Sequence, residues 1–382
     1  MTDLTACREA IDRIDTQVMS LLLERQQVSA EVAAYKAAHG MQVLDRSRER
    51  AKIAQAQSLV PPELAPYATM LQDTLMEASR DAQHRLLDDQ AHPISPLISK
   101  TLASQPAYFP LEATVATQGV EGAFQQIAAT RLFPQGHISF YENFEQVFQA
   151  VEDGSCQFGV LPVENSNAGS VNSVYRLMRR HRFFIVRSCR LRIDHNLLVL
   201  PGTRREDIQI VYSHEQALAQ CADYIASLPH ARPHLAKNTA AAAEKVATEG
   251  RKDTAAIASR DCAALYGLEI LDHEVQDSSS NYTRFACISK DLVIYPGAER
   301  TSMTLVLNHE PGALYKVLAK IYALGINVVK LESRPIPNRD FEFMFYLDIS
   351  YPAAAPQFLA LMDTLNSYCE EFRYLGSHSE VI

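Results

Sequence analysis

The chain has 382 residues, which is too long for one ordinary hydrophobic core and predicts two or three domains. Its hydrophobic content of 47% and charged content of 21% are those of an ordinary globular protein, and no apolar run is long enough to span a membrane. The net charge of −9 argues against a nucleic-acid-binding surface, and the charged, amphipathic N-terminus is unlike a signal peptide. The seven cysteines are scattered without a CxxC pair, so we expect reduced thiols, no metal site, no cofactor and a cytoplasmic location.

Residues 1–90 are predicted to form an all-helical module. Apolar residues recur at steps of three and four from Leu4 to about His39, which predicts one long helix with a buried apolar seam. The seam consists of Leu4, Cys7, Ile11, Ile14, Val18, Leu21, Val28, Val32 and Tyr35. A second helix is expected from Asp45 to the prolines at 61–62, and a third over 63–88. Because two short helices cannot cover the long one, we expect self-association.

Three cations mark one side of the long helix. Arg25 is the charged residue on the seam, and burying an arginine is costly unless an anion meets it. Arg8 and Lys36 lie 28 residues apart in the same heptad register, which places them roughly 42 Å apart along a straight helix. Lys36 and Arg25 are only roughly 16 Å apart, so these two can share a small anion. We therefore expect Arg8 to serve the site of a second, antiparallel chain.

The polar positions of this module form a recognisable pattern. It runs Arg8–x16–Arg25–x10–Lys36, then Asp45-x-x-Arg48-Glu49, then Ser79-x3-Gln83, and it resembles the all-helical chorismate mutases over residues 4–85. Spacing alone favours a helical dimerisation module whose charges are solvated. The resemblance implies a pericyclic rearrangement of chorismate to prephenate, which needs a held dianion and no nucleophile, base or metal. It implies that carboxylates are held by Arg8 of a partner chain, Arg25 and Arg48; the ether oxygen by Lys36 and Gln83; and the hydroxyl side by Asp45, Glu49 and Ser79.

Residues 91–112 are rich in proline and serine and are predicted to be a linker. From 113 to 290, short apolar runs alternate with helical stretches, which predicts an α/β domain with a mostly parallel sheet in two lobes, similar to periplasmic binding proteins. Several strand ends lead into helix N-termini, where free N–H groups suit anions. These corners are Gln118 to Ala123, the run 162–171 with Glu164 and Asn165, Ser213 with Gln216 as a capping box, and Asn238-Thr239.

Together these corners are more specific than any one of them. The runs PVENS and VYSHEQALAQC, with the final Asn281-Tyr282-Thr283-Arg284-Phe285, resemble the prephenate dehydratase domain along its length. One departure is Ala123 after the first glycines, where family members carry a hydroxyl. The resemblance implies loss of carboxylate and hydroxyl from prephenate to give phenylpyruvate. It implies that Thr283 donates to the departing hydroxyl and that Asn165, Ser213 and Gln220 orient the substrate. Arg284 would pair with a carboxylate or brace the loop, and Glu164 would be an acid or a structural acceptor. Phe285 completes the Thr-Arg-Phe signature.

Residues 298–382 repeat the α/β style on a smaller scale, in the order βαββαβ of a ferredoxin-like fold. Without further information this is a folding or dimerisation domain. Its two motifs resemble the ACT domain attached to prephenate dehydratases, which implies feedback control by bound L-phenylalanine. The implied effector-binding residues are Gly312, Ala313, Leu314, Asn327, Glu332, Ser333 and Arg334.

The sequence and these resemblances therefore predict a bifunctional chorismate mutase–prephenate dehydratase that binds chorismate, prephenate and L-phenylalanine. We expect a homodimer with a shared mutase site, or a higher oligomer. Two alternatives stay open. One is a dehydratase that prefers arogenate. The other is an amino-acid-binding protein whose helices only dimerise, because fold alone does not fix function.

Overall fold

The computed structural model describes residues 3–87, 93–336, 339 and 342–382. The chain forms two compact units, Met1–Pro93 and Ile94–Ile382, and each is described by itself. Within the described residues, no helix is both long and apolar enough to cross a membrane.

The first unit is helical, as predicted. It contains α1 (Leu4–Ala38), α2 (Arg46–Ser58), a short 3-10 turn η1 (Pro62–Leu64) and α3 (Ala65–Leu87). The Asp3 side chain caps α1 by accepting from Thr5 N–H, and Asp45 caps α2 by accepting from Arg48 N–H. Both α1 and α2 pack against α3.

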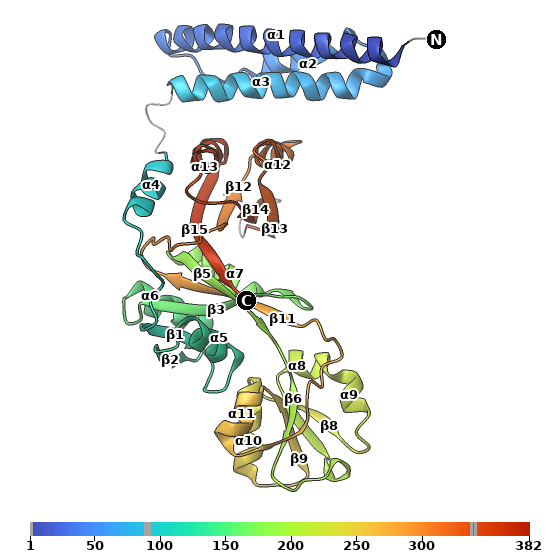
Figure 1. The fold of residues 1–382 in the computed structure, drawn as a ribbon, viewed down its shortest axis with the longest axis vertical. Coiled ribbons are helices and arrows are strands. Elements are labelled where there is room, and N and C mark those ends of the chain that lie inside the picture. Colours follow the sequence, from blue (N-terminus) through green and yellow to red (C-terminus); the bar gives the residue numbers. More distant parts are fainter. Residues whose placement is uncertain (1–2, 88–92, 337–338, 340–341) are drawn as a thin grey trace. The chain divides into compact units, whose positions relative to one another are not determined.

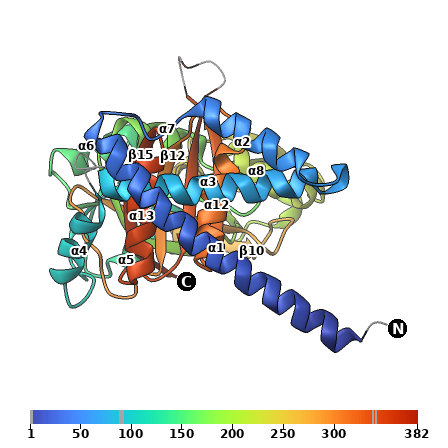
Figure 2. The same cartoon turned by 90° about the horizontal axis from the view of Figure 1, so that it is seen from above.

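The apolar seam of α1 is exposed in the single chain, and its burial by the expected self-association stays a prediction. Eight of the nine seam residues, from Leu4 to Tyr35, are between 39% and 63% exposed, and the buried positions of α1 are Ser29 and Ala33. Figure 2 shows the N-terminal half of α1 extending away from α2 and α3. The small residues face α3 because they allow close approach, so the large apolar side chains remain for another surface.

Residues 91–112 differ from the predicted linker. Helix α4 (Ser95–Ala103) begins directly after the first unit, and its Ile98 is fully buried in the core of the C-terminal subdomain. The backbone N–H of Ser95 donates to Asp363 Oδ1 at 2.9 Å on helix α13 (Pro356–Tyr368). Pro96 lies in the first turn of this helix, where proline is tolerated, so composition alone misled the prediction.

The first lobe of the α/β domain is one end of a large mixed sheet (Figure 1). Its elements are β1 (Thr114–Gln118), α5 (Phe124–Leu132), β2 (His137–Tyr141), α6 (Phe144–Glu152), β3 (Phe158–Asn165), β4 (Gly169–Ser170), α7 (Asn172–Arg180), β5 (Phe184–Arg192) and β11 (Tyr282–Ser289). Strands β2 and β3 flank β1 in parallel, whereas β11 is antiparallel to both β3 and β5. The prediction of a mostly parallel sheet is therefore wrong, because β5 and β11 run to and from the second lobe.

The second lobe has its own sheet, in the order β10-β6-β9-β7-β8. Its elements are β6 (Asn196–Val199), η2 (Arg205–Asp207), β7 (Ile210–Ser213), α8 (Glu215–Gln220), α9 (Ala222–Ala226), β8 (Arg232–Leu235), α10 (Thr239–Glu249), β9 (Thr254–Ala258), α11 (Arg260–Tyr266) and β10 (Glu269–Asp272). Two connections, β5 to β6 and β10 to β11, join the lobes. They are bonded to each other where Ile193 N–H donates to the Asn281 carbonyl at 2.8 Å.

The C-terminal subdomain has the predicted βαββαβ order. It comprises β12 (Arg300–Val306), α12 (Ala313–Ala323), β13 (Asn327–Pro335), β14 (Phe343–Ser350), α13 and β15 (Glu371–Val381). Strand β15 pairs with β12 at its start and, at Ser379–Val381, with β5 in parallel, so it joins the C-terminal subdomain to the sheet of the first lobe (Figure 1). At the crossing, Gly376 adopts φ +126°, and a Cβ there would lie 2.3 Å from the Ile185 carbonyl oxygen.

Candidate functional site

In the helical unit, Arg25 and Ser79 are brought together from α1 and α3. Arg25 Nη1 donates to Ser79 Oγ and to the Leu75 carbonyl, and Ser29 Oγ donates to Ser79 Oγ at 2.8 Å. Burial lowers the pKa of Arg25 from its ordinary value, although a guanidinium remains charged at neutral pH. Gln83 lies one turn beyond Ser79 and is 7% exposed, and its Oε1 has no hydrogen-bond partner among the residues that the structure describes. The site thus holds a cation beside an unsatisfied amide.

The cations and carboxylates around the second helix are placed differently. Lys36 Nζ donates to the Val43 carbonyl at 2.6 Å, so the ammonium folds back toward the α1–α2 connection. The Asp45 carboxylate serves as the cap of α2. Glu49 forms an ion pair with Arg80, the residue after Ser79, which sequence reasoning did not include.

Arg8 and Arg48 remain apart from this group in the single chain. The Arg8 side chain is exposed near the start of α1 and has no polar partner within the described residues. Arg48 is also exposed, and its backbone N–H bonds to the helix cap. Because α1 is one continuous helix, the rise of about 1.5 Å per residue keeps Arg8 away from the Arg25 side chain.

In the α/β domain, a polar cluster lies where the two lobes join. Thr283 on β11 stands directly opposite Asn165 on β3 in the antiparallel register, and Asn165 Nδ2 donates to Thr283 Oγ1 at 3.0 Å. The same amide nitrogen donates to Asn281 Oδ1 at 2.8 Å. Asn281 Nδ2 in turn donates to Gln220 Oε1 at 3.0 Å, and Gln220 Oε1 lies 3.2 Å from His195 Nε2. Three of the predicted residues, Asn165, Gln220 and Thr283, thus form one network.

The directions of the hydrogen bonds in this network leave the Thr283 hydroxyl able to donate a hydrogen bond. Asn165 is fixed because its Oδ1 accepts from the backbone N–H groups of Asn167 and Ala168, at 3.0 and 2.9 Å. Its nitrogen therefore faces Thr283, and Thr283 Oγ1 must accept that bond. The Thr283 hydroxyl hydrogen then remains for a ligand, although the residue is only 9% exposed.

Ser213 and the helix that follows differ from the prediction. His214, and not Ser213, caps α8, with its Nδ1 accepting from Gln216 N–H at 3.3 Å. Ser213 is fully buried and its Oγ donates to the Ile257 carbonyl at 2.6 Å, so it braces β7 against β9. At α10 the cap is likewise Asn238 rather than Thr239. In both cases the residue with the better-placed side-chain acceptor lies one position away from the predicted cap.

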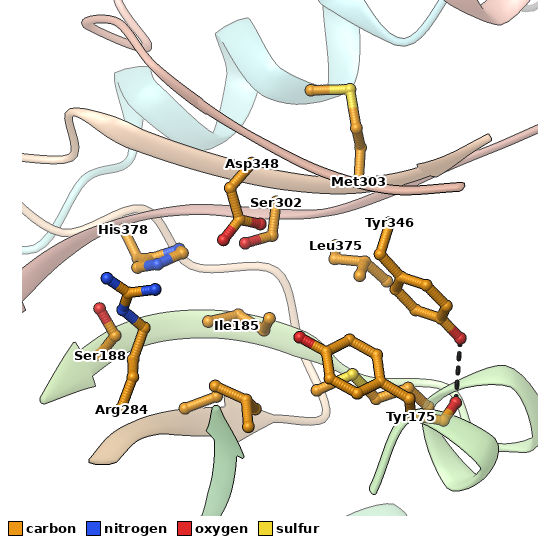
Figure 3. Close-up of a pocket in the computed structure, with 13 residues that line it drawn as sticks. Tyr175, Ile185, Ser188, Arg284, Ser302, Met303, Tyr346, Asp348, Leu375 and His378 are labelled. Atoms are coloured by element: carbon orange, nitrogen blue, oxygen red, sulfur yellow. Dashed lines mark hydrogen bonds between the residues drawn. The ribbon is translucent and has the colours of Figure 1, made fainter. Parts of the chain in front are cut away.

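Arg284 follows Thr283 on β11, so strand alternation turns its side chain to the opposite side of the sheet. Figure 3 shows this side chain directed toward His378 of β15, in the C-terminal subdomain. Its guanidinium donates to Glu164 at 2.6 Å and to Glu380 of β15 at 2.6 Å. Lys330 of β13 lies 3.4 Å from the other Glu164 oxygen. Phe285 is 2% exposed in the core of the first lobe. The paired charges indicate that Glu164 and Arg284 brace the domain junction, and the burial of Phe285 indicates packing.

A small cavity lies in this junction between the two parts of the large sheet. Figure 3 shows Arg284, Ser302, Asp348 and His378 turned toward it. Burial raises the pKa of the Asp348 carboxyl, to which Ser302 is hydrogen bonded. Burial, with Arg300 and Arg284 nearby, lowers the pKa of His378 to about 3, so this ring is neutral.

The predicted effector residues fall into separate places. A groove lies at the start of α12, lined by Gly312, Ala313, Leu314 and their neighbours, with Phe343 and Phe345 from β14. Asn327 is exposed at the other end of the subdomain sheet, where β13 begins. Side chains alternate along β13, so Asn327 and Ser333 share the exposed face, whereas Glu332 and Arg334 are bonded to each other on the inward face. Glu332 also accepts from Ser170 Oγ of the first lobe.

Comparisons with known proteins agree with this division. Residues 7–84 match the model of chorismate mutase type II, and residues 115–292 match that of prephenate dehydratase. An Arabidopsis thaliana arogenate dehydratase/prephenate dehydratase is 36% identical over 80% of this chain and 78% of its own length. The chain belongs to the prephenate dehydratase family.

Other relatives extend the similarity. The bifunctional chorismate mutase/prephenate dehydratase of Escherichia coli K12 is 29% identical over 98% of this chain and 96% of its own length. A prephenate dehydratase from Arthrobacter aurescens, solved in complex with L-Phe, matches 70% of this chain at 26% identity with a TM-score of 0.64. A protein described as a novel type of quorum quenching acylase, GqqA, matches 69% of this chain at 33% identity with the same TM-score.

Sequence reasoning missed three residues of this family member's sites. His195 and Asn281 hold the Gln220 amide, and Arg80 holds Glu49. Asn281 directly precedes β11 and stands two residues before Thr283, which was a usable signal that the two side chains share one side. Nothing in the sequence pointed to His195, whose partner lies 25 positions away on another element. Within the described segments, no cluster of three metal-ligating side chains occurs.

Proposed function

We propose that this protein carries out two consecutive steps: it rearranges chorismate to prephenate in its helical unit and converts prephenate to phenylpyruvate in its α/β domain. The observation that carries the proposal is the Thr283 hydroxyl, fixed by Asn165 with its proton free, in a chain that matches both families in the same order as a bifunctional relative.

The mutase step needs a held dianion and charge stabilisation, not a nucleophile. Arg25 supplies a half-buried cation, and Gln83 supplies an amide with unused hydrogen-bonding capacity one turn from Ser79. Arg8 cannot reach this place in its own chain, and the apolar seam of α1 is exposed. Both observations support a homodimer in which α1 of a second copy covers the seam and brings its Arg8 to the site. Such a site is incomplete in a single chain.

The dehydratase step breaks two bonds and makes an aromatic ring. The electrons of the ring–carboxylate bond move into the ring as carbon dioxide leaves, and the hydroxyl on the opposite carbon departs as water after taking up one proton. Threonine is too weak an acid to deliver that proton at equilibrium, so Thr283 acts by a hydrogen bond that strengthens along the breaking C–O bond. The Gln220 amide, held on its oxygen side by Asn281, can offer N–H groups to a carboxylate.

We also propose feedback control by L-phenylalanine through the C-terminal subdomain, acting as an ACT domain. The solved relative that contains L-Phe and the βαββαβ order support this. The groove at Gly312–Leu314 supplies the backbone N–H groups of a helix N-terminus, and Phe343 and Phe345 supply apolar lining. A continuous set of charges leads from this subdomain to β11: Arg334–Glu332–Lys330–Glu164–Arg284. It ends one residue from Thr283.

The substrate of the second step has a specific alternative. Several relatives are named arogenate dehydratases, including one from Petunia hybrida that is 40% identical over 69% of this chain. Prephenate and arogenate differ only in the side-chain keto or amino group. The ratio of kcat/KM for the two compounds decides between them, and we expect it to favour prephenate because the same chain carries the mutase that makes it.

The two activities separate by mutation. Arg25→Ala should abolish phenylpyruvate formation from chorismate while turnover of added prephenate persists. Thr283→Ala should lose roughly 10²- to 10³-fold in dehydratase kcat while chorismate is still consumed. Absorbance of phenylpyruvate in strong base, with chorismate or prephenate supplied, measures both. Near-normal turnover in either variant refutes the corresponding assignment, and loss of both activities in one variant indicates misfolding.

A further inference from the structure

One buried histidine at the lobe junction has no role in the mechanism above. His195 lies in the connection between β5 and β6 and is 3% exposed. Its backbone N–H donates to Gln276 Oε1 at 2.9 Å, and its carbonyl accepts from Val275 N–H at 2.8 Å, so the other lobe connection holds it in place. Its ring stands edge-on to Phe124 of α5, with centroids 5.7 Å apart. The ring is therefore fixed from both sides.

The hydrogen bond of this ring defines its tautomer. Nε2 lies 3.2 Å from Gln220 Oε1, and a carbonyl oxygen can only accept, so Nε2 carries the hydrogen. Nδ1 is buried and has no hydrogen-bond partner in the described part of the chain. A charged ring would place a second N–H, with no acceptor, in this apolar surrounding. Burial accordingly lowers the pKa of His195 to about 4, so the ring is neutral at pH 7.

The Gln220 amide is oriented by a chain of hydrogen bonds that begins at Asn165. Asn165 Nδ2 donates to Asn281 Oδ1, so Asn281 presents its Nδ2–H to Gln220 Oε1, and His195 Nε2–H is the second donor to that oxygen. Turning the amide over would set its NH₂ group against Asn281 Nδ2–H and would remove the acceptor of His195 Nε2–H. The amide nitrogen is consequently held on the other side, and no protein acceptor for it occurs within the described residues. Its two N–H groups remain for a ligand.

We propose that His195 is a positioning residue of the dehydratase reaction, a neutral donor that locks the Gln220 amide with both of its N–H groups available to a substrate carboxylate. This inference rests on the proposed dehydratase function. Asn281 also donates to Gln220 Oε1, but its own Oδ1 accepts from Asn165. Among the described residues, the polar contact of the His195 side chain is with Gln220.

Steady-state kinetics on prephenate test the proposal in the full-length protein. His195→Phe keeps a ring beside Phe124 but removes the donor, and we expect kcat/KM to fall about 10- to 100-fold, mainly through KM. His195→Gln retains an N–H donor and should recover most of that loss. The double variant with Gln220→Leu should be no worse than Gln220→Leu alone, because the histidine acts through that amide. Mutase turnover of chorismate, from a separate unit, should be unchanged in all variants.

A second measurement does not depend on activity. In protein with ¹⁵N-labelled histidine, the His195 ring should remain the Nε2–H tautomer from pH 7 to pH 5.5, and its proton signal should shift in Gln220→Leu. A ring that is doubly protonated at pH 6, wild-type kcat/KM in His195→Phe, or additive losses in the double variant each overturn the proposal. If the wild-type protein does not convert prephenate, the proposed function fails, and the resonance data still decide whether His195 holds Gln220.

Discussion

The junction between the catalytic sheet and the C-terminal subdomain should weaken in mild acid because His378 is buried there without charge. The pKa of His378 is lowered to about 3, against an ordinary value of 6.5. The unfolded segment therefore binds a proton between pH 6.5 and 3 that the folded segment excludes. Stability is complete above pH 6.5 and is lost as the pH falls through this window. The loss amounts to about 2 kcal/mol between pH 7 and pH 5, and about 3 kcal/mol by pH 4.

Hydrogen exchange measured on peptides from β15 and β5 reports the opening of this junction separately from the helical unit. Asp348 acts in the opposite direction, because its raised pKa favours the folded state in acid, so the comparison must be with a variant. In His378→Gln the opening free energy should lose its slope between pH 7 and 5 relative to the parent. His230→Gln, at an exposed position, should retain the parental slope. Identical slopes for the parent and His378→Gln refute the reasoning.

Two further predictions concern the same junction. Lys330→Met removes the link between Glu332 and Glu164, so inhibition by L-phenylalanine should weaken by about 5-fold or more, while dehydratase turnover without L-phenylalanine stays within about threefold of the parent. As a control, Lys290→Met at an exposed position should change neither quantity. Unchanged inhibition in Lys330→Met excludes coupling through these charges. Gly376→Ala should destabilise the protein by about 3 kcal/mol or more in thermal unfolding, because the added Cβ meets the β5 backbone. Gly154 also has a positive φ, but a Cβ there would lie in open space, so Gly154→Ala should cost only about 1 kcal/mol. Equal losses of stability in the two variants would contradict the clash.

Local patterns predicted most of the elements. The period of three and four identified α1, and apolar runs located strands such as β3 and β9 within one or two residues. Four strands were not predicted, β2, β4, β8 and β10, and these carry mostly exposed or half-buried residues, so they lack an apolar run. The direction of the strands was also wrong. Strand direction depends on which lobe each connection enters, and this is a long-range property that periodicity does not contain.

Motifs predicted which segments form the sites but not what each side chain does there. Asn165 and Thr283 were expected together, and they are hydrogen bonded. Ser213 was expected to face substrate, but its hydroxyl donates to a neighbouring strand. Arg284 follows Thr283 by one residue, and strand alternation turns it to the opposite side, toward Glu380. A carboxylate 96 positions later in the chain cannot be inferred from the signature itself, so its role required the fold.

The path of β15 determines how feedback control can be tested. Deleting residues 298–382 is the obvious test for effector binding by the C-terminal subdomain. However, the deletion also removes the strand that pairs with β5 and the Glu380 partner of Arg284. The remaining arginine would be half-buried with one carboxylate lost, and breaking such a pair costs several kcal/mol when the charge stays buried. Loss of L-phenylalanine binding in that truncation is therefore expected even if the effector binds elsewhere. Leu314→Lys places a charge at the groove on α12 and leaves β15 intact. Calorimetry on Leu314→Lys should show no heat with L-phenylalanine while dehydratase turnover is retained, and full binding by this variant would exclude the groove.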